Sequence, residues 1–167
     1  MRYGEVIRCI EEQVSKDSRV LEVGSGGGRM AIEVARRMGC TVYGVDSSQF
    51  AVAQARRRAL AIGLSKKAIF MNQRSESLNF PPGFFDLVYT VKTLHETRAM
   101  ETLKEMYRVL RDDGKLVIAD WVEGALTWTH ENYFSPEELE EMIKRSGFRI
   151  SWFDVLNDVM LLIAKKE

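Results

Sequence analysis

Residues 19–28 read Arg-Val-Leu-Glu-Val-Gly-Ser-Gly-Gly-Gly, and this stretch decides the fold. Residues 19–24 are typical of a buried β-strand, which stops where four glycines fall within five positions. Apolar residues at helical spacing follow from Met30 to Met38, and Gly39 ends that helix. A strand, a glycine-rich turn and a helix predict the first unit of a parallel α/β sheet, with a turn whose backbone can bind a ligand.

The rest of the chain repeats this alternation. The connection at Asn157-Asp158 is too short for a parallel crossover, so the last two strands form an antiparallel pair. We expect an α/β fold with a doubly wound, Rossmann-like sheet of seven strands and helices between the first six. The other expected strands are residues 41–46, 67–72, 85–91, 115–120, 148–154 and 159–164, and the other helices are 5–14, 48–62, 98–110 and Ser135 to Gly147.

Composition excludes several classes of protein. The 167 residues suffice for one domain, and 24 basic against 24 acidic residues give no global field for nucleic acid. The longest stretch without a charge is nine residues, so a membrane-spanning helix is not expected. Cys9 and Cys40 cannot form a zinc site alone or a disulfide framework, so we expect a cytoplasmic protein without a metal.

Two acidic residues near the glycines indicate the ligand. Glu22 ends a buried strand, where its carboxylate would face a cationic group such as an amino-acid ammonium or tie down loop N–H groups. Asp46 follows Gly24 by 22 residues, near the offset of a ribose-binding acid, although it could instead cap the next helix. A dinucleotide fingerprint would need glycine at position 29, which is Arg29.

At these residues the sequence resembles a family. Residues 20–28 resemble motif I of the class I S-adenosylmethionine-dependent methyltransferases, and Val45-Asp46 resembles the acidic second motif. The resemblance is closest to a small-molecule (type 11) group that includes quinone-biosynthesis methyltransferases. It implies a strand order of 3-2-1-4-5-7-6 with strand 7 antiparallel, and one domain over 1–167 without an inserted lid. Further matching segments are 75–80, 84–88 with Leu94-His95, 105–116, 134–139 and 146–148.

The resemblance also implies residue roles. Backbone groups of the glycine-rich turn would hold the methionine part, with Glu22 at its amino group and Asp46 at the ribose. Arg74 stands where the family has an aspartate on the adenine amino group; arginine offers no acceptor, so that contact must come from elsewhere. The remaining residues implied at the cofactor are Gly24, Ser25, Gly26 and Gly28 in the turn, Ser47, Phe50, Ser75 and Glu76 around adenine, and Thr90 and Val91 beneath the sulfonium.

The sequence gives fewer indications of which residues contact the methyl acceptor. His95 is the candidate general base because its ordinary pKa, about 6.5, suits proton transfer, although a packing role is the alternative. Tyr3, Lys92, Trp121 and Trp128 are the candidate acceptor pocket; His130, Tyr133 and Phe134 share the last tryptophan's loop.

We expect methyl transfer to a small molecule by a monomer or homodimer. Methylation of a protein or RNA, a non-catalytic cofactor-binding subunit and a nicotinamide oxidoreductase are the alternatives.

Overall fold

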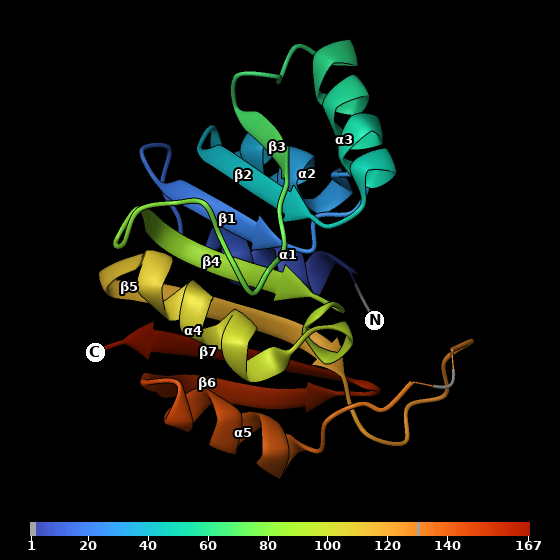
Figure 1. Ribbon diagram of the computed structural model, residues 1–167, viewed down its shortest axis with the longest axis vertical. Helices are drawn as coiled ribbons and strands as arrows, with labels where there is room; N and C mark the ends of the chain where they lie inside the picture. Colours follow the sequence, from blue (N-terminus) through green and yellow to red (C-terminus); the bar gives the residue numbers. More distant parts are fainter. Residues whose placement is uncertain (1–2, 130) are drawn as a thin grey trace.

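The computed structural model describes residues 3–129 and 131–167 (Figure 1). Seven strands form one sheet in the order β3-β2-β1-β4-β5-β7-β6, as expected. The strands are β1 (Arg19–Val23), β2 (Thr41–Asp46), β3 (Ala68–Asn72), β4 (Phe85–Val91), β5 (Leu110–Trp121), β6 (Phe148–Leu156) and β7 (Val159–Lys166). The helices are α1 (Tyr3–Glu11), α2 (Arg29–Met38), α3 (Gln49–Ala61), η1 (Leu94–Glu96), α4 (Ala99–Val109) and α5 (Pro136–Arg145).

Strand pairing gathers the loops at one edge of the sheet. The first five strands pair in parallel, and β7 runs antiparallel between β5 and β6. The carboxyl ends of parallel strands therefore lie side by side, and the segments that follow β1, β2, β4 and β5 meet there. This edge is where a doubly wound sheet binds ligands.

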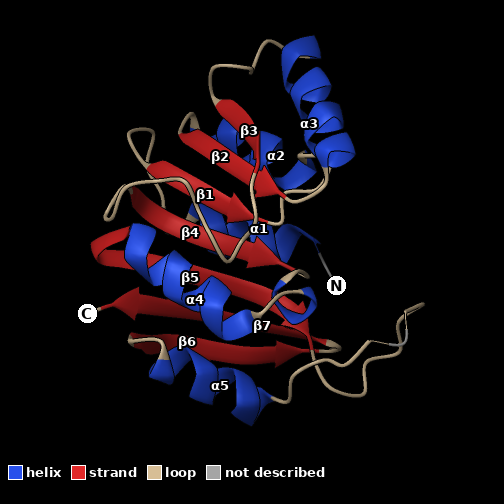
Figure 2. Ribbon diagram, in the orientation of Figure 1, coloured by secondary structure: helices blue, strands red, loops and turns tan. Residues whose placement is uncertain are grey.

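Helices cover both faces of the sheet (Figure 2). Buried residues of α1, α2 and α3 pack on one face, and those of α4 and α5 pack on the other. Val6, Ile7 and Ile10 are buried, as the spacing of the first helix predicts. Within the described residues, no helix has the length and apolarity to cross a bilayer.

One expectation about the helices is wrong. No helix is present in residues 73–84, which connect β3 to β4. The rings of Tyr43, Phe80, Phe84 and Phe85 pack there with centroids 4.8–5.9 Å apart, and they bury this part of the sheet instead.

Several boundaries also differ from the predictions. The first helix ends at Glu11 rather than at residue 14. β5 begins at Leu110 rather than at residue 115, because α4 ends at Val109 and the strand follows at once. Residues 111–114 are looped out of the pairing between β4 and β5, with Asp113 at φ 62°. The last two strands extend to residues 156 and 166 because their antiparallel pairing continues that far.

Gly28 has a fixed packing requirement at the start of α2. Its φ is 80°, and a Cβ there would lie 2.7 Å from both Ala55 Cβ and Phe70 Cζ. Only glycine gives the turn its left-handed backbone and lets α3 and β3 pack this closely.

We expect Gly28→Ala to destabilise the protein by about 2–5 kcal/mol, from left-handed strain and overpacking together. The matched control is Gly63→Ala, where φ is 72° but the added Cβ meets open space. That variant should lose only the strain of about 1–2 kcal/mol. Urea unfolding measures both, and equal losses would show that packing at Gly28 is unimportant.

Candidate active site

The glycine-rich turn is fastened to the end of β2. The backbone N–H groups of Gly24 and Ser25 both donate to the Val45 carbonyl, at 2.9 and 3.0 Å. The Asp46 carboxylate accepts from Gly26 N and from Ser48 N, each at 2.9 Å. Asp46 therefore ties two loops together.

Asp46 is not the N-cap of α3. The cap is Ser48, whose Oγ accepts from Ala51 N at 3.2 Å. Each Asp46 oxygen accepts one backbone N–H, and a carboxylate has about four lone-pair sites. Acceptor capacity therefore remains on the side that faces a cavity.

A cavity of about 490 Å³ opens beside Asp46. It brings together residues from the ends of β1 and β2, the segment after β3 and the segment after β4. Phe50 does not line it, and its side chain points to solvent with 72% exposed. The residues predicted at the cofactor that line it are Gly24, Asp46, Ser47, Ser75 and Glu76. Arg74 also lines it, together with Val23, Val45, Gln73, Thr93, Glu96 and Thr97, for which no cofactor contact was predicted.

Glu76 is the charged acceptor in this cavity. Burial would raise its pKa, but backbone hydrogen bonds, including that from Arg98 N at 3.3 Å, and the nearby Arg74 lower the pKa overall. The Arg74 guanidinium is mostly exposed and lies 3.7 Å from a Glu76 oxygen. Ser75 bonds to Thr102 instead, with 2.9 Å between the hydroxyl oxygens.

A second cavity of about 360 Å³ lies on the other side of Gly24. Glu22 lines it and is 3% exposed, and Tyr89 OH donates to its carboxylate at 3.1 Å. Burial raises the pKa of Glu22 to about 8 against this hydrogen bond, so the group carries a proton at neutral pH. Ser25 Oγ is buried here and has no hydrogen-bond partner among the described residues. A protonatable carboxylate and an unsatisfied hydroxyl fit a polar ligand with an ammonium group.

Of the two residues at the end of β4 that were predicted at the cofactor, only one lines a cavity. Val91 lines the second cavity, whereas Thr90 is fully buried and its hydroxyl donates to the Val23 carbonyl at 2.9 Å, joining β4 to β1. Thr90 lines neither cavity. Lys92 follows with a left-handed φ of 54°.

Only some of the residues predicted for the acceptor pocket lie at the second cavity. Tyr3 and Lys92 line the second cavity, and Lys92 Nζ lies 3.8 Å from the centre of the Trp121 ring. Burial lowers the pKa of Lys92 against the charge of Asp120. Trp128 is fully exposed and lies in neither cavity, and His130 is outside the described residues.

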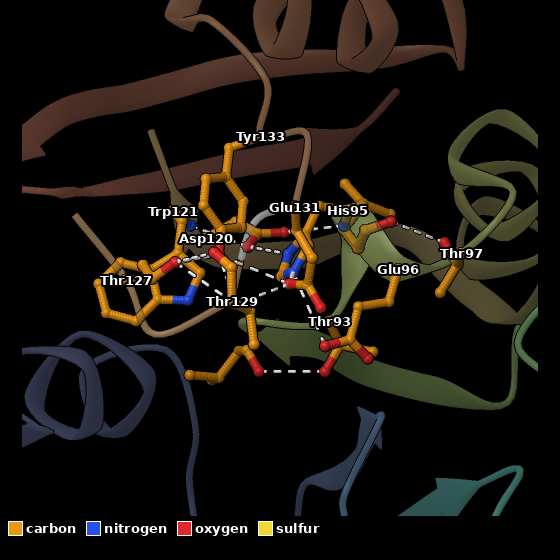
Figure 3. Close-up of polar contacts among 12 residues, drawn as sticks. Thr93, His95, Glu96, Thr97, Asp120, Trp121, Thr127, Thr129, Glu131 and Tyr133 are labelled. Atoms are coloured by element: carbon orange, nitrogen blue, oxygen red, sulfur yellow. Dashed lines mark hydrogen bonds and ion pairs between the residues drawn. The ribbon is translucent and has the colours of Figure 1, made fainter. Parts of the chain in front are cut away.

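His95 lies in η1 but does not line either cavity. Its side chain is 2% exposed, with Nδ1 2.6 Å from Asp120 and Nε2 2.9 Å from Glu131 (Figure 3). Burial alone would lower the pKa of His95, but these two carboxylates and Glu96 raise it overall.

Asp120 and Glu131 were missed by sequence reasoning. They lie 25 and 36 residues from His95, and only the adjacency of β4 and β5 brings Asp120 to it. His95, Glu96 and Glu131 offer ligand atoms within 4.8 Å of one another, a spacing that a metal ion could use. Hydrogen bonds from His95 to Asp120 and Glu131 already hold these side chains together. That the protein works without a metal stays a prediction.

Comparison with known proteins matches a family described as a methyltransferase domain to residues 20–114, more than half of the chain. This chain belongs to the class I S-adenosylmethionine-dependent methyltransferase superfamily. Membership names S-adenosylmethionine as the cofactor of this fold, and Glu22, Ser25 and Asp46 fit its amino acid and ribose groups.

Individual relatives either cover only part of this chain or share little sequence identity with it. A sterol 24-C-methyltransferase of Saccharomyces cerevisiae is 31% identical over 110 residues, which cover 65% of this chain and 29% of that enzyme. A crystal structure of a [4+2]-cyclase superposes with a TM-score of 0.91 at 21% identity, covering 97% of this chain and 80% of the other. A geranyl diphosphate methyltransferase in complex with S-adenosylmethionine gives 0.87 at 14% identity, covering 98% and 79%. These two structures support the fold alone.

We predict that Glu22→Gln changes how stability depends on pH. With a folded pKa of about 8 against an ordinary 4.5, the folded state holds a proton that the unfolded chain releases. Stability conferred by this proton is complete below pH 4.5 and declines by about 1.4 kcal/mol per pH unit up to pH 8. Glutamine keeps an acceptor for Tyr89 but cannot ionise.

The free energy of unfolding in urea, measured for both proteins between pH 5 and 8.5, tests this prediction. The variant should gain on the wild type steadily as pH rises, since every other titrating group is shared. Glu123→Gln, at an exposed position after β5, is the matched control and should show no such gain. A constant difference would show that Glu22 is ionised throughout.

Proposed function

We propose that this protein transfers a methyl group from S-adenosylmethionine to a small-molecule acceptor, with residues 1–167 acting as one cofactor-binding domain. It would act in the cytoplasm as a monomer or homodimer. Because the match covers 29% of the sterol 24-C-methyltransferase, neither the acceptor nor the activity is carried over from that enzyme.

The supporting observation is the pair of cavities that share Gly24. The larger one offers carboxylates at Asp46 and Glu76 for hydroxyl and amino donors. The smaller one offers Glu22 and the unpartnered Ser25 hydroxyl. A ligand with a nucleoside at one end and an amino acid at the other matches both sets of groups.

The residues divide this work by chemistry. Asp46 would accept from the ribose hydroxyls, and Glu76 would supply the adenine acceptor that Arg74 lacks. Glu22 would give up its proton when an ammonium group binds, because the new positive charge lowers the pKa of the buried carboxyl. The bound cofactor supplies a methyl group already activated by a positive sulfur.

The protein's contribution to the reaction is placement. Holding two reactants in line can supply about 7–11 kcal/mol of the barrier without any covalent step. Val91, Lys92 and Tyr3 would form the wall on which the acceptor lies, beside the Glu22 end of the cofactor site.

Asp46→Ala should weaken S-adenosylmethionine binding at least tenfold, since two hydrogen bonds to a charged acceptor are worth about 1.5–3 kcal/mol each. The matched control is Asp154→Ala on β6, away from both cavities. Titration calorimetry measures the affinities, and circular dichroism confirms that the variant folds. Unchanged affinity would remove Asp46 from the cofactor site.

His95→Ala should reduce turnover while leaving cofactor affinity within about twofold. His95 lines neither cavity, so the cofactor does not depend on it, whereas loss of a general base costs roughly 10²–10⁴ in rate. Product formation from labelled cofactor with fractionated extract gives the rate, and calorimetry gives the affinity. Parallel losses in both would place His95 in the cofactor site.

A further inference from the structure

The imidazole of His95 lies between carboxylates of two different kinds (Figure 3). Asp120 is fully buried at the end of β5 and lies 2.6 Å from Nδ1. Glu131 belongs to the loop of residues 122–134, has a side chain 40% exposed, and lies 2.9 Å from Nε2. One contact is part of the core, and the other is at the surface.

Asp120 fixes the ring in one orientation. Its Oδ2 accepts from the backbone N–H of His95 at 3.1 Å, and its Oδ1 accepts from Trp121 N at 2.8 Å as well as facing Nδ1. A buried carboxylate on Nδ1 keeps a proton on that nitrogen and leaves Nε2 as the one that exchanges protons. Nε2 points away from β5 toward the loop of residues 122–134.

That loop is held at its base and projects at its tip. Glu123 N donates to the Phe134 carbonyl at 2.9 Å, which joins the two ends of the loop. Leu126 is 95% exposed and Trp128 is fully exposed, so the tip carries apolar side chains in solvent. In Figure 1 the loop extends away from the sheet. Glu131 lies beside Tyr133, which is 9% exposed and packs edge-on against the His95 ring with the centroids 4.9 Å apart. The exposed Glu131 side chain can therefore turn away while this part of the loop stays packed.

Nε2 lies beside a residue that lines the larger cavity. Glu96 lines the larger cavity and has an oxygen 3.7 Å from Nε2. Trp121, next to Asp120, packs under Lys92, which lines the smaller cavity. A molecule that replaced Glu131 at Nε2 would therefore lie beside the cofactor site.

We propose that the Glu131 carboxylate holds the place of an acceptor oxygen at His95 Nε2, and that the exposed Glu131 side chain turns away when the acceptor binds. The acceptor class is then an enol, a phenol or a carboxylic acid, methylated on oxygen. Asp120 is the positioning residue. This inference rests on the proposed function, whose acceptor atom it names.

The step balances as a proton transfer with a displacement. The acceptor O–H gives its proton to neutral Nε2, and the oxygen lone pair forms the new O–C bond to the methyl group. The methyl–sulfur bond breaks, and its electron pair stays on sulfur. Asp120 stabilises the imidazolium that results, as a buried carboxylate does behind a histidine base.

The test uses Glu131→Ala and small oxygen acids as probes. Nitrogen NMR of the His95 ring, assigned by the spectrum of His95→Gln, reports its pKa and hydrogen bonds. Removing the carboxylate should lower the pKa of His95 by about one unit or more. Sodium acetate should restore the pKa saturably in this variant, and phenol should compete with acetate for the same position.

Two variants serve as controls. Glu123→Ala removes a carboxylate from the same loop and should leave the His95 spectrum unchanged, with no response to acetate. Asp120→Asn, combined with Glu131→Ala, should abolish the acetate response while S-adenosylmethionine affinity stays within twofold. If the combined variant does not fold, the Glu131→Ala result decides alone.

Three outcomes would overturn the proposal. First, acetate and phenol could produce no saturable change in the His95 pKa of Glu131→Ala. Second, acetate could raise that pKa equally in the variant that also lacks the Asp120 carboxylate. Third, magnesium or zinc alone could shift the Nε2 signal of the wild type saturably. The last would make Nε2 a metal ligand. Calorimetry with S-adenosylmethionine separates the two proposals. Lost cofactor binding refutes the proposed function, whereas normal binding with no probe response refutes the proposed acceptor position at Nε2 alone.

Discussion

The site depends on how the turn after β1 is fastened to the end of β2. Three consecutive N–H groups, from Gly24 to Gly26, donate to acceptors on Val45 and Asp46. These bonds hold the turn close to β2, and Gly44 on that strand permits the approach, because a Cβ there would lie 2.7 Å from Ser25 Cβ. The two cavities acquire their common border at Gly24 from this single attachment. The position of this turn therefore sets the distance between the groups proposed for the nucleoside and those proposed for the amino acid.

Electrostatics then distinguish the two ends of the site. Burial keeps Glu22 protonated at neutral pH, so the smaller cavity holds no uncompensated negative charge before a cation arrives. Backbone hydrogen bonds and neighbouring arginines keep Glu76 ionised in the larger one. Carboxyl groups in one site thus carry different charges because their surroundings differ. The ligand that fits brings a positive charge to the first and hydrogen-bond donors to the second.

Much of the fold could be predicted because the signals are local. Runs of apolar residues and the glycine cluster give the strands, and the short turn at Asn157-Asp158 fixes the antiparallel pair. The segment 73–84 was misjudged because aromatic packing replaced the expected helix, and packing leaves no periodic signal. The strand expected to begin at residue 115 begins at Leu110 instead, because residues 111–114 only interrupt its pairing with β4.

In the site, too, residues with a local sequence signal could be predicted and those brought together by tertiary packing could not. Glu22 and Asp46 could be predicted from their distance to the glycines along the chain. The His95 cluster could not, because its three parts come from η1, the end of β5 and a loop. Whether Asp120 reaches His95 depends on the register between β4 and β5, in which Val91 pairs with Ala119. Thr90 was assigned to the ligand, but its hydroxyl serves the sheet instead.

The anchoring of the adenine-side wall has an evolutionary consequence. Arg108 on α4 donates to the carbonyls of Leu78 and Phe80 at 2.8 and 2.7 Å, and Glu105 accepts from Leu78 N at 2.7 Å. The segment that begins with Gln73 to Glu76 is therefore held by a helix, whereas residues 122–134 are joined at their own two ends. Under the proposed function, selection can change the second segment for a new acceptor while the first continues to bind a common methyl donor. A scaffold divided in this way can diversify its chemistry one loop at a time.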